Sequence, residues 1–210
     1  SGSQGPLSSI AVLFYPGHMR APGGEQDDAL AALGEKVHAV YDALAGVGLT
    51  PPVVSGGSTP TLWRSHEIPH LTEVRAGTWI FNDRDIVGLG VAGADEIAYS
   101  VLATVVSTAV AGQAVVDAGS KALAKEARGG GSADYGVLLE RPEVVVKGLS
   151  EEHGILDLSA TDWRPSVGDR VRVVPNHVCV SVNLQDELLV IEGDAVDRWP
   201  LEARGRGPEG

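Results

Sequence analysis

Pro52-Val53-Val54-Ser55 runs directly into Gly56-Gly57-Ser58-Thr59-Pro60, and this stretch decides the fold of the first part of the chain. A short apolar run that ends in a glycine-rich loop, followed by a helical pattern over residues 61–66, is typical of a β/α unit. Upstream, residues 10–15 (I-A-V-L-F-Y) predict a buried parallel strand, and residues 25–45 carry leucine and valine at helical spacing.

A third strand is predicted at about residues 72–81. Three β/α units in succession indicate a parallel sheet or part of a (β/α) barrel. We therefore expect an α/β domain over residues 1–83.

From Asn82 onward the pattern changes to short valine-rich runs separated by turn signals. The runs predict strands at residues 101–110, 114–117, 143–146, 170–174, 178–182 and 187–192. We expect a second, all-β domain over residues 84–210, an antiparallel barrel or sandwich. Residues 97–116 hold no charged side chain, but their valine content favours two strands joined at Ala111-Gly112 over a membrane helix.

The composition narrows the class of protein. The net charge of -12 argues against nucleic acid and anionic membranes as partners. A single cysteine excludes an internal disulfide framework and indicates a cytoplasmic protein. No signal-peptide pattern is present at the start of the sequence.

The loop at residues 56–59 is the first candidate site. Glycines let backbone N–H groups approach an anion closely, and a helix N-terminus favours negative charge, so the loop is suited to one phosphate group. The alternative is an ordinary turn in which Ser58 or Thr59 caps the following helix. Tyr15, at the end of the first strand, could stack on a cofactor at the same edge or could be a core aromatic.

His177 and Cys179 form the second candidate site. In a strand, residues i and i+2 point to the same face, so the imidazole and the thiol could converge on a metal ion, zinc above all. Two ligands suit an open site that water or substrate completes. The alternative is simple packing of a buried cysteine.

Taken together, these stretches resemble the C-terminal part of the D-serine dehydratase and D-threonine aldolase family, which are metal-activated pyridoxal-phosphate enzymes of the alanine-racemase fold type. The matching motifs occur in the family's order: Tyr15-Pro16-Gly17-His18, residues 55–61 (S-G-G-S-T-P-T), 73–83 (E-V-R-A-G-T-W-I-F-N-D), 117–123 (D-A-G-S-K-A-L), 149–154 (L-S-E-E-H-G) and 175–179 (P-N-H-V-C).

The resemblance implies the last three β/α units of an alanine-racemase-like barrel, followed by a β domain that completes the site. It implies that Gly56, Gly57, Ser58 and Thr59 hold the phosphate of pyridoxal phosphate, with Tyr15, Asn82 and Asp83 also on the cofactor side. It implies that His177 and Cys179 bind Zn²⁺, with Mn²⁺ possible in the aldolase branch.

The activity implied is a lyase reaction on a small D-β-hydroxy-amino acid, either dehydration of D-serine to pyruvate and ammonia or retro-aldol cleavage of D-threonine. The family's Schiff-base lysine lies on the first barrel strand, and none of Lys36, Lys121, Lys125 and Lys147 occupies the matching place. We therefore expect this chain to be a fragment of a homodimeric parent enzyme. The alternatives are a non-catalytic metal- or ligand-binding remnant and a racemase-like protein.

Overall fold

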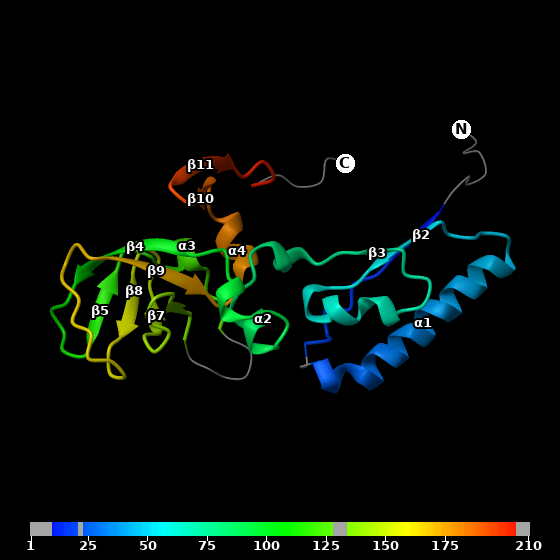
Figure 1. The fold of residues 1–210 in the computed structure, drawn as a ribbon, viewed down its shortest axis with the longest axis horizontal. Helices are drawn as coiled ribbons and strands as arrows, with labels where there is room; N and C mark the ends of the chain where they lie inside the picture. The colour runs from blue at the N-terminus through cyan, green and yellow to red at the C-terminus, as the bar shows by residue number, and fades with distance from the viewer. Residues whose placement is uncertain (1–9, 21–22, 128–133, 205–210) are drawn as a thin grey trace. The chain divides into compact units, whose positions relative to one another are not determined.

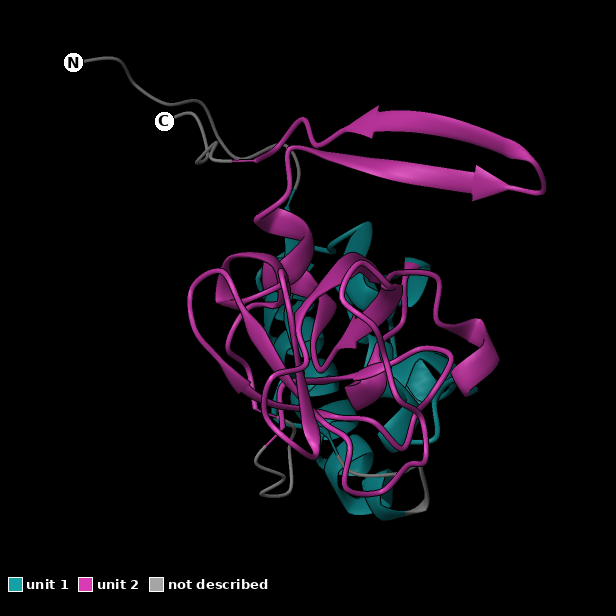
Figure 2. Cartoon of the chain, turned by 90° about the vertical axis from the view of Figure 1, so that its left-hand side faces the viewer, with its two compact units in different colours: residues 1–80, 86–93 teal, residues 81–85, 94–210 magenta. Residues whose placement is uncertain are grey.

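The computed structural model describes residues 10–20, 23–127 and 134–204, and divides the chain into two compact units. Unit 1 contains residues 1–80 and 86–93, and unit 2 contains residues 81–85 and 94–210. Figure 2 colours the two units separately. The domain limits expected from the sequence, 1–83 and 84–210, stay a prediction.

Unit 1 is built on a parallel three-stranded sheet in the order β1-β2-β3 (Figure 1). Its strands are β1 (Ala11–Leu13), β2 (Val53–Gly56) and β3 (Glu73–Val74), and its helices are η1 (Gly23–Gln26), α1 (Asp27–Gly46), η2 (Thr59–Glu67) and η3 (Gly77–Ile80). The parallel strands and the long helix α1 agree with the sequence patterns. However, β1 is shorter than the predicted run at residues 10–15 and is mostly exposed instead of buried. The third strand is much shorter than predicted, because the chain turns into the 3-10 helix η3.

One face of this sheet is covered by α1. Leu30, Gly34 and Val37 repeat at helical spacing and are buried on the face of α1 that packs against Val54 and Ile68. The other face is open in this chain, since Leu13 and Val53 point away from α1 and remain exposed.

Unit 2 is an antiparallel sheet that closes almost completely into a barrel. The strand order is β6-β9-β4-β5-β8-β7, and an antiparallel bridge between Val137 and Val145 returns from the last strand to the first. The strands are β4 (Val101–Ser107), β5 (Gln113–Val116), β6 (Gly136–Leu138), β7 (Val146–Leu149), β8 (Gly154–Asp157) and β9 (Arg170–Pro175). This confirms the antiparallel barrel and the two strands within residues 97–116.

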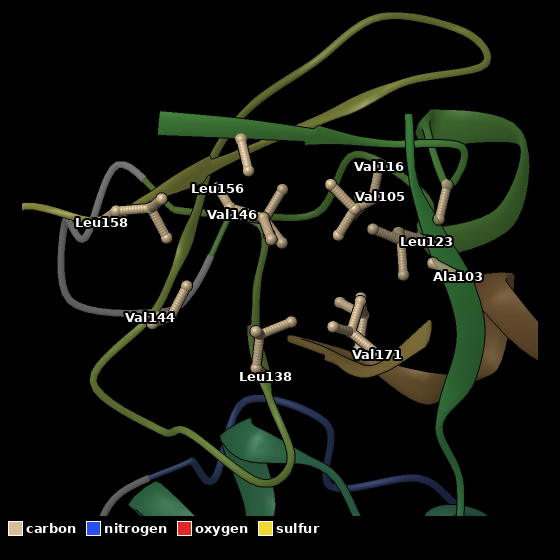
Figure 3. Close-up of a cluster of buried hydrophobic side chains, with 13 residues drawn as sticks. Ala103, Val105, Val116, Leu123, Leu138, Val144, Val146, Leu156, Leu158 and Val171 are labelled. Carbon is tan, nitrogen blue, oxygen red and sulfur yellow. The ribbon is translucent and has the colours of Figure 1, made fainter. Parts of the chain in front are cut away.

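The barrel interior is filled by small aliphatic side chains that alternate with outward-facing residues along each strand. Figure 3 shows Val105, Val116, Val146 and Leu156 pointing toward one another, and all four are fully buried.

Short helices and a hairpin complete the structure: α2 (Arg84–Gly88), η4 (Ala94–Glu96), α3 (Ser120–Leu123), α4 (Val178–Asn183), and the two-stranded sheet of β10 (Glu187–Glu192) and β11 (Ala195–Pro200). The strand predicted at residues 178–182 is wrong, because this stretch forms α4. Among the described residues, no helix has both the length and the apolar character needed to cross a bilayer.

Candidate functional site

His177 lies in unit 2, at the junction between β9 and α4. Its backbone is extended (φ -133°, ψ 131°) and it stands at the N-cap of α4. Its ring Nδ1 lies 2.8 Å from Oδ2 of Asp83, whose side chain is 1% exposed. The same carboxylate oxygen accepts a hydrogen bond of 3.0 Å from the backbone N–H of Val178. A buried carboxylate therefore fixes both the imidazole and the first turn of α4.

The surroundings of His177 favour positive charge at its ring. The hydrogen bond to Asp83 and a second one to the side chain of Cys179 raise the pKa of His177 to about 10, against the opposing effect of burial. The Asp83 carboxylate at Nδ1 is the kind of partner that orients a metal-binding imidazole, whose other nitrogen, Nε2, would face the ion.

Cys179 reaches His177 in a way that the sequence did not predict. It is the second residue of α4 and its side chain is exposed. The two side chains meet because a helix begins between them, and not because they share the face of a strand. The alternating valines suggested a strand, but the non-local cap from Asp83 stabilises a helix instead.

The donor set at this position is small. Among residues 10–20, 23–127 and 134–204, no group of three or more His, Cys, Asp or Glu side chains could hold a metal ion. One imidazole nitrogen and one thiolate nevertheless fit a borderline ion such as zinc, with water or substrate completing the coordination.

The glycine-rich loop of unit 1 is tightly built. A Cβ atom at Gly56 would lie 2.2 Å from Cζ of Phe14, and Gly57 has a φ of +84°. Only glycine meets both demands without strain, so the backbone at the end of β2 carries no side chain of its own and is closely packed against neighbouring side chains. The 3-10 helix η2 begins two residues later, and the first N–H groups of a helix have no partner within it.

Ser58 and Thr59 are both buried. The hydroxyl of Ser58 lies 3.1 Å from that of Thr61, and Oγ1 of Thr59 accepts a bond of 3.1 Å from the N–H of Thr78. The backbone N–H of Ser58 also donates to Oγ1 of Thr61 at 3.2 Å, so Ser58 caps η2, as the alternative interpretation predicted, whereas the bond of Thr59 joins η2 to η3. A hydroxyl that accepts one bond still has a hydrogen to donate, so Thr59 also fits an anion.

Arg75 is a candidate site residue that sequence reasoning missed. Its Nε donates to Oγ of Ser55 at 3.0 Å, and its Nη2 donates to the carbonyl oxygen of Phe14 at 2.7 Å. Ser55 in turn donates to Glu73 at 2.5 Å. An exposed guanidinium thus crosses the carboxyl ends of the three parallel strands, beside the glycine-rich loop. The only sequence signal was its place in the motif at residues 73–83.

Tyr15 and Asn82 differ in environment. The ring of Tyr15 is exposed and packs over Gly17, where a Cβ atom would lie 2.3 Å from Cε1. Asn82, which belongs to unit 2, is buried with a positive φ of 50°. Its Nδ2 donates to the carbonyl oxygen of Glu96 at 3.1 Å, whereas its Oδ1 is buried without a hydrogen-bond partner among the described residues. Asn82 therefore presents an acceptor that a ligand could satisfy.

Two of the motifs that suggested the family form one structural contact. The N–H groups of Ser120 and Lys121 donate to the carbonyl oxygens of Ser150 and Glu151, at 2.8 and 3.1 Å. A Cβ atom at Gly119 would lie 2.4 Å from the Glu151 carbonyl oxygen, so this approach requires glycine. Lys121 pairs with Glu152 at the surface.

Sequence comparisons place these features in a family. Residues 98–191 match the family model described as "Putative serine dehydratase domain". An uncharacterised protein of Mycobacterium tuberculosis is 34% identical over 132 residues, which are 60% of this chain and 98% of that protein. The chain belongs to the D-serine dehydratase and D-threonine aldolase family.

Within this family, the D-threo-3-hydroxyaspartate dehydratase of Delftia sp. is 38% identical over 207 residues, covering 83% of this chain and 54% of the enzyme. Its solved structure has a TM-score of 0.78 and covers 94% of this chain. D-threonine aldolase from Filomicrobium marinum has a TM-score of 0.81 at 29% identity, over 92% of this chain and 53% of the aldolase. The chain thus spans about half the length of the Delftia dehydratase and of the Filomicrobium aldolase.

Solved variants of D-threo-3-hydroxyaspartate dehydratase include one with a histidine replaced by alanine and one with a cysteine, two positions further on, replaced by alanine. The cysteine variant is in a metal-free form. The same spacing separates His177 and Cys179 in this chain.

Proposed function

We propose that the chain is the C-terminal part of a metal-assisted, pyridoxal-phosphate-dependent lyase that acts on small D-β-hydroxy-amino acids. The observation that carries the proposal is His177, held at Nδ1 by the buried Asp83 and lying beside Cys179. Family membership and the dehydratase and aldolase among the relatives support the reaction class.

The residues of unit 2 would hold the metal. Nε2 of His177 and the thiolate of Cys179 are soft to borderline donors, which favours Zn²⁺, with Mn²⁺ as the alternative. A two-ligand site leaves room for a substrate hydroxyl in the coordination sphere, and a bound metal supplies Lewis acidity at that hydroxyl. The histidine and cysteine variants of D-threo-3-hydroxyaspartate dehydratase support this assignment.

The residues of unit 1 would hold the cofactor phosphate. The backbone at Gly56 and Gly57 is free of side chains, Thr59 can donate from its hydroxyl, and Arg75 supplies positive charge at the same edge of the sheet. Pyridoxal phosphate, when bound, supplies an electron sink for the bond broken at the substrate's α-carbon. Tyr15 offers an exposed ring. Asn82 belongs to unit 2, and its role on the cofactor side stays a prediction.

The test uses the parent protein, with the lysine-bearing part of the barrel present. It is supplied with pyridoxal phosphate and Zn²⁺ or Mn²⁺ and assayed with D-serine, D-threonine and D-threo-3-hydroxyaspartate. Dehydration gives a 2-keto acid and ammonia, whereas retro-aldol cleavage gives glycine and an aldehyde or glyoxylate. The L-isomers serve as the stereochemical control. No product from any D-substrate would contradict the proposal.

Two variants test the metal separately. His177→Ala and Cys179→Ala should each lower both metal content and activity by orders of magnitude, because either change leaves a single protein ligand. Chelation should abolish the activity, and added Zn²⁺ or Mn²⁺ should restore it. An enzyme with unchanged metal content after His177→Ala would show that the ligand assignment is wrong.

A non-catalytic binding remnant is the second candidate. It is favoured by the positions of the lysines, since Lys121 pairs with Glu152 and Lys147 with Asp157 in unit 2, and Lys36 lies on α1. A remnant would bind pyridoxal phosphate without the visible absorbance of a protein-bound Schiff base. A racemase-like activity would instead interconvert alanine enantiomers without added metal, which a separate assay with D- and L-alanine would test. Homodimerisation and a cytoplasmic location stay predictions.

A further inference from the structure

Each residue of the segment 83–85 forms a hydrogen bond with the segment at residues 176–178. The N–H of Asp85 donates to the carbonyl oxygen of Asn176 at 3.2 Å, and Nη1 of Arg84 donates to Oδ1 of Asn176 at 2.5 Å. Asp83 accepts from both His177 and Val178 through one carboxylate oxygen. We call Asp83, Arg84 and Asp85 the 83–85 clamp.

Asn176 anchors the clamp to the rest of unit 2. It is 1% exposed, and its Nδ2 donates to the carbonyl oxygens of Glu126 and Asp134, at 3.0 and 2.7 Å. Arg84 also forms an ion pair with Asp134, and both side chains are largely buried. Both polar atoms of the Asn176 side chain thus have partners, so the backbone that leads into His177 is held from two sides.

We propose that Asp83 is the positioning residue of the His177–Cys179 pair, and that the 83–85 clamp sets the affinity of this site for its metal. The inference rests on the proposed metal site, and it gives Asp83 a role behind the metal ligand in place of the cofactor contact expected from the sequence. A carboxylate that accepts from Nδ1–H leaves Nε2 with its lone pair for the metal, fixes the ring plane and makes the imidazole a stronger donor.

The geometry separates this role from simple helix capping. The single oxygen Oδ2 serves both the ring of His177 and the N–H of Val178, so the imidazole and the start of the helix that carries Cys179 are fixed by one atom. A capping role alone would change the stability of the chain and leave the affinity of the folded site for metal unchanged. A positioning role changes the affinity of the folded site.

The experiment titrates the 210-residue chain with Co²⁺ and follows the thiolate-to-cobalt charge-transfer absorbance, which reports ligation by Cys179. Asp83→Ala should raise the Kd by about 10–100-fold, because it removes both the hydrogen bond and the charge behind the imidazole. Asp83→Asn, whose amide oxygen can keep both hydrogen bonds, should raise the Kd by less. Asp162→Asn is the matched control, since it removes one negative charge from an exposed position of the same unit.

Far-UV circular dichroism and thermal unfolding check that each variant is folded. If Asp83→Ala does not fold, the near-isosteric Asp83→Asn decides. A wild-type Kd overturns the inference when it is measured in folded Asp83→Ala, or in folded Asp83→Asn if the alanine variant does not fold, provided that His177→Ala and Cys179→Ala lose binding. If those two variants also bind Co²⁺ as the wild type does, the metal site of the proposed function is itself wrong.

Discussion

The sheets of the two units are buried in different ways. In unit 2 the sheet curls until the bridge between Val137 and Val145 nearly closes it, and its side chains fill the interior. In unit 1 the sheet is parallel and α1 covers only one of its faces. Parallel sheets are normally covered on both faces. The exposed face of unit 1 therefore supports the proposal that β1, β2 and β3 belong to a larger (β/α) barrel.

In each unit, the architecture determines where the protein groups of the candidate site lie. Unit 1 offers backbone groups and Arg75 at the carboxyl ends of parallel strands, the usual position of sites in β/α folds. Unit 2 offers side chains at a strand-to-helix junction, held there by a carboxylate from a distant segment.

The largest expected effect concerns the core of unit 2, whose side chains pack together in the barrel interior (Figure 3). Leu156→Ala, at a fully buried position, should lower the free energy of unfolding by about 2–5 kcal/mol, because it leaves a cavity in a closed barrel. Leu13→Ala, at a position 65% exposed on the open face of unit 1, should cost less than about 0.5 kcal/mol. Urea unfolding of both variants measures the difference. Equal losses would contradict the contrast between a closed and an open sheet.

The next prediction concerns the loop of unit 1, which is packed as tightly as a core. Gly56→Ala should destabilise the chain by about 1–3 kcal/mol, because the new Cβ would overlap the ring of Phe14. Gly46→Ala is the matched control, since nothing lies within 4 Å of the added atom and alanine favours a helix. Hydrogen exchange should localise the change to unit 1. A neutral Gly56→Ala would show that the Phe14 ring moves aside freely.

A third prediction concerns the buried hydrogen bonds of Ser181, which lies on α4. The hydroxyls of Tyr99 and Ser181 lie 3.0 Å apart, and Ser181 donates to the carbonyl oxygen of Ala122 at 2.6 Å. Tyr99→Phe should cost about 1 kcal/mol at neutral pH, because it removes one buried hydrogen bond.

The pH dependence of this variant follows from the same tyrosine. Burial raises the pKa of Tyr99 above its ordinary value of 10.0, and the bond to Ser181 opposes this only in part. The folded state thus keeps the proton that the unfolded chain loses, so stability is lost as the pH rises above about 10. Urea unfolding across this pH range should show a weaker alkaline loss for Tyr99→Phe than for the wild type. An identical alkaline loss would exclude Tyr99 as its cause.

The smallest expected effect concerns the surface pair of Lys121 and Glu152. Both side chains are about two-thirds exposed, so solvent screens their attraction. Lys121→Ala should leave the midpoint of unfolding unchanged within error, and the same holds for metal binding. A clear loss of metal affinity in this variant would assign Lys121 a role that its contacts do not indicate.

The sequence predicted those parts of the fold that depend on local patterns. The apolar run at residues 10–15, the helical spacing of Leu30 and Val37, and the valine-rich strands of the barrel all have a period that a single segment reveals. The third strand of unit 1 is shorter than predicted. The strand predicted at residues 178–182 is wrong, because tertiary contacts favour a helix there. The deciding contact is Asp83, 95 residues from Val178.

The candidate sites divide in the same way. The glycine-rich loop could be predicted, since its requirement for glycine is local. The bond between His177 and Asp83 and the reach of Arg75 across three strands could not be predicted, because both join residues far apart in the sequence. Gly119 shows the reverse case, since its motif suggested function and the structure gives it a role in packing.

The non-local cap on α4 has a consequence for the order of folding. Asp83 leaves the ribosome 95 residues before Val178, and closing so long a loop is slow compared with forming a local helix or hairpin. Until that loop closes, the valine-rich segment around Cys179 lacks the contact that makes it helical. A nascent chain would thus carry its imidazole and thiol in an unordered arrangement, and metal capture would be a late event in the maturation of the protein.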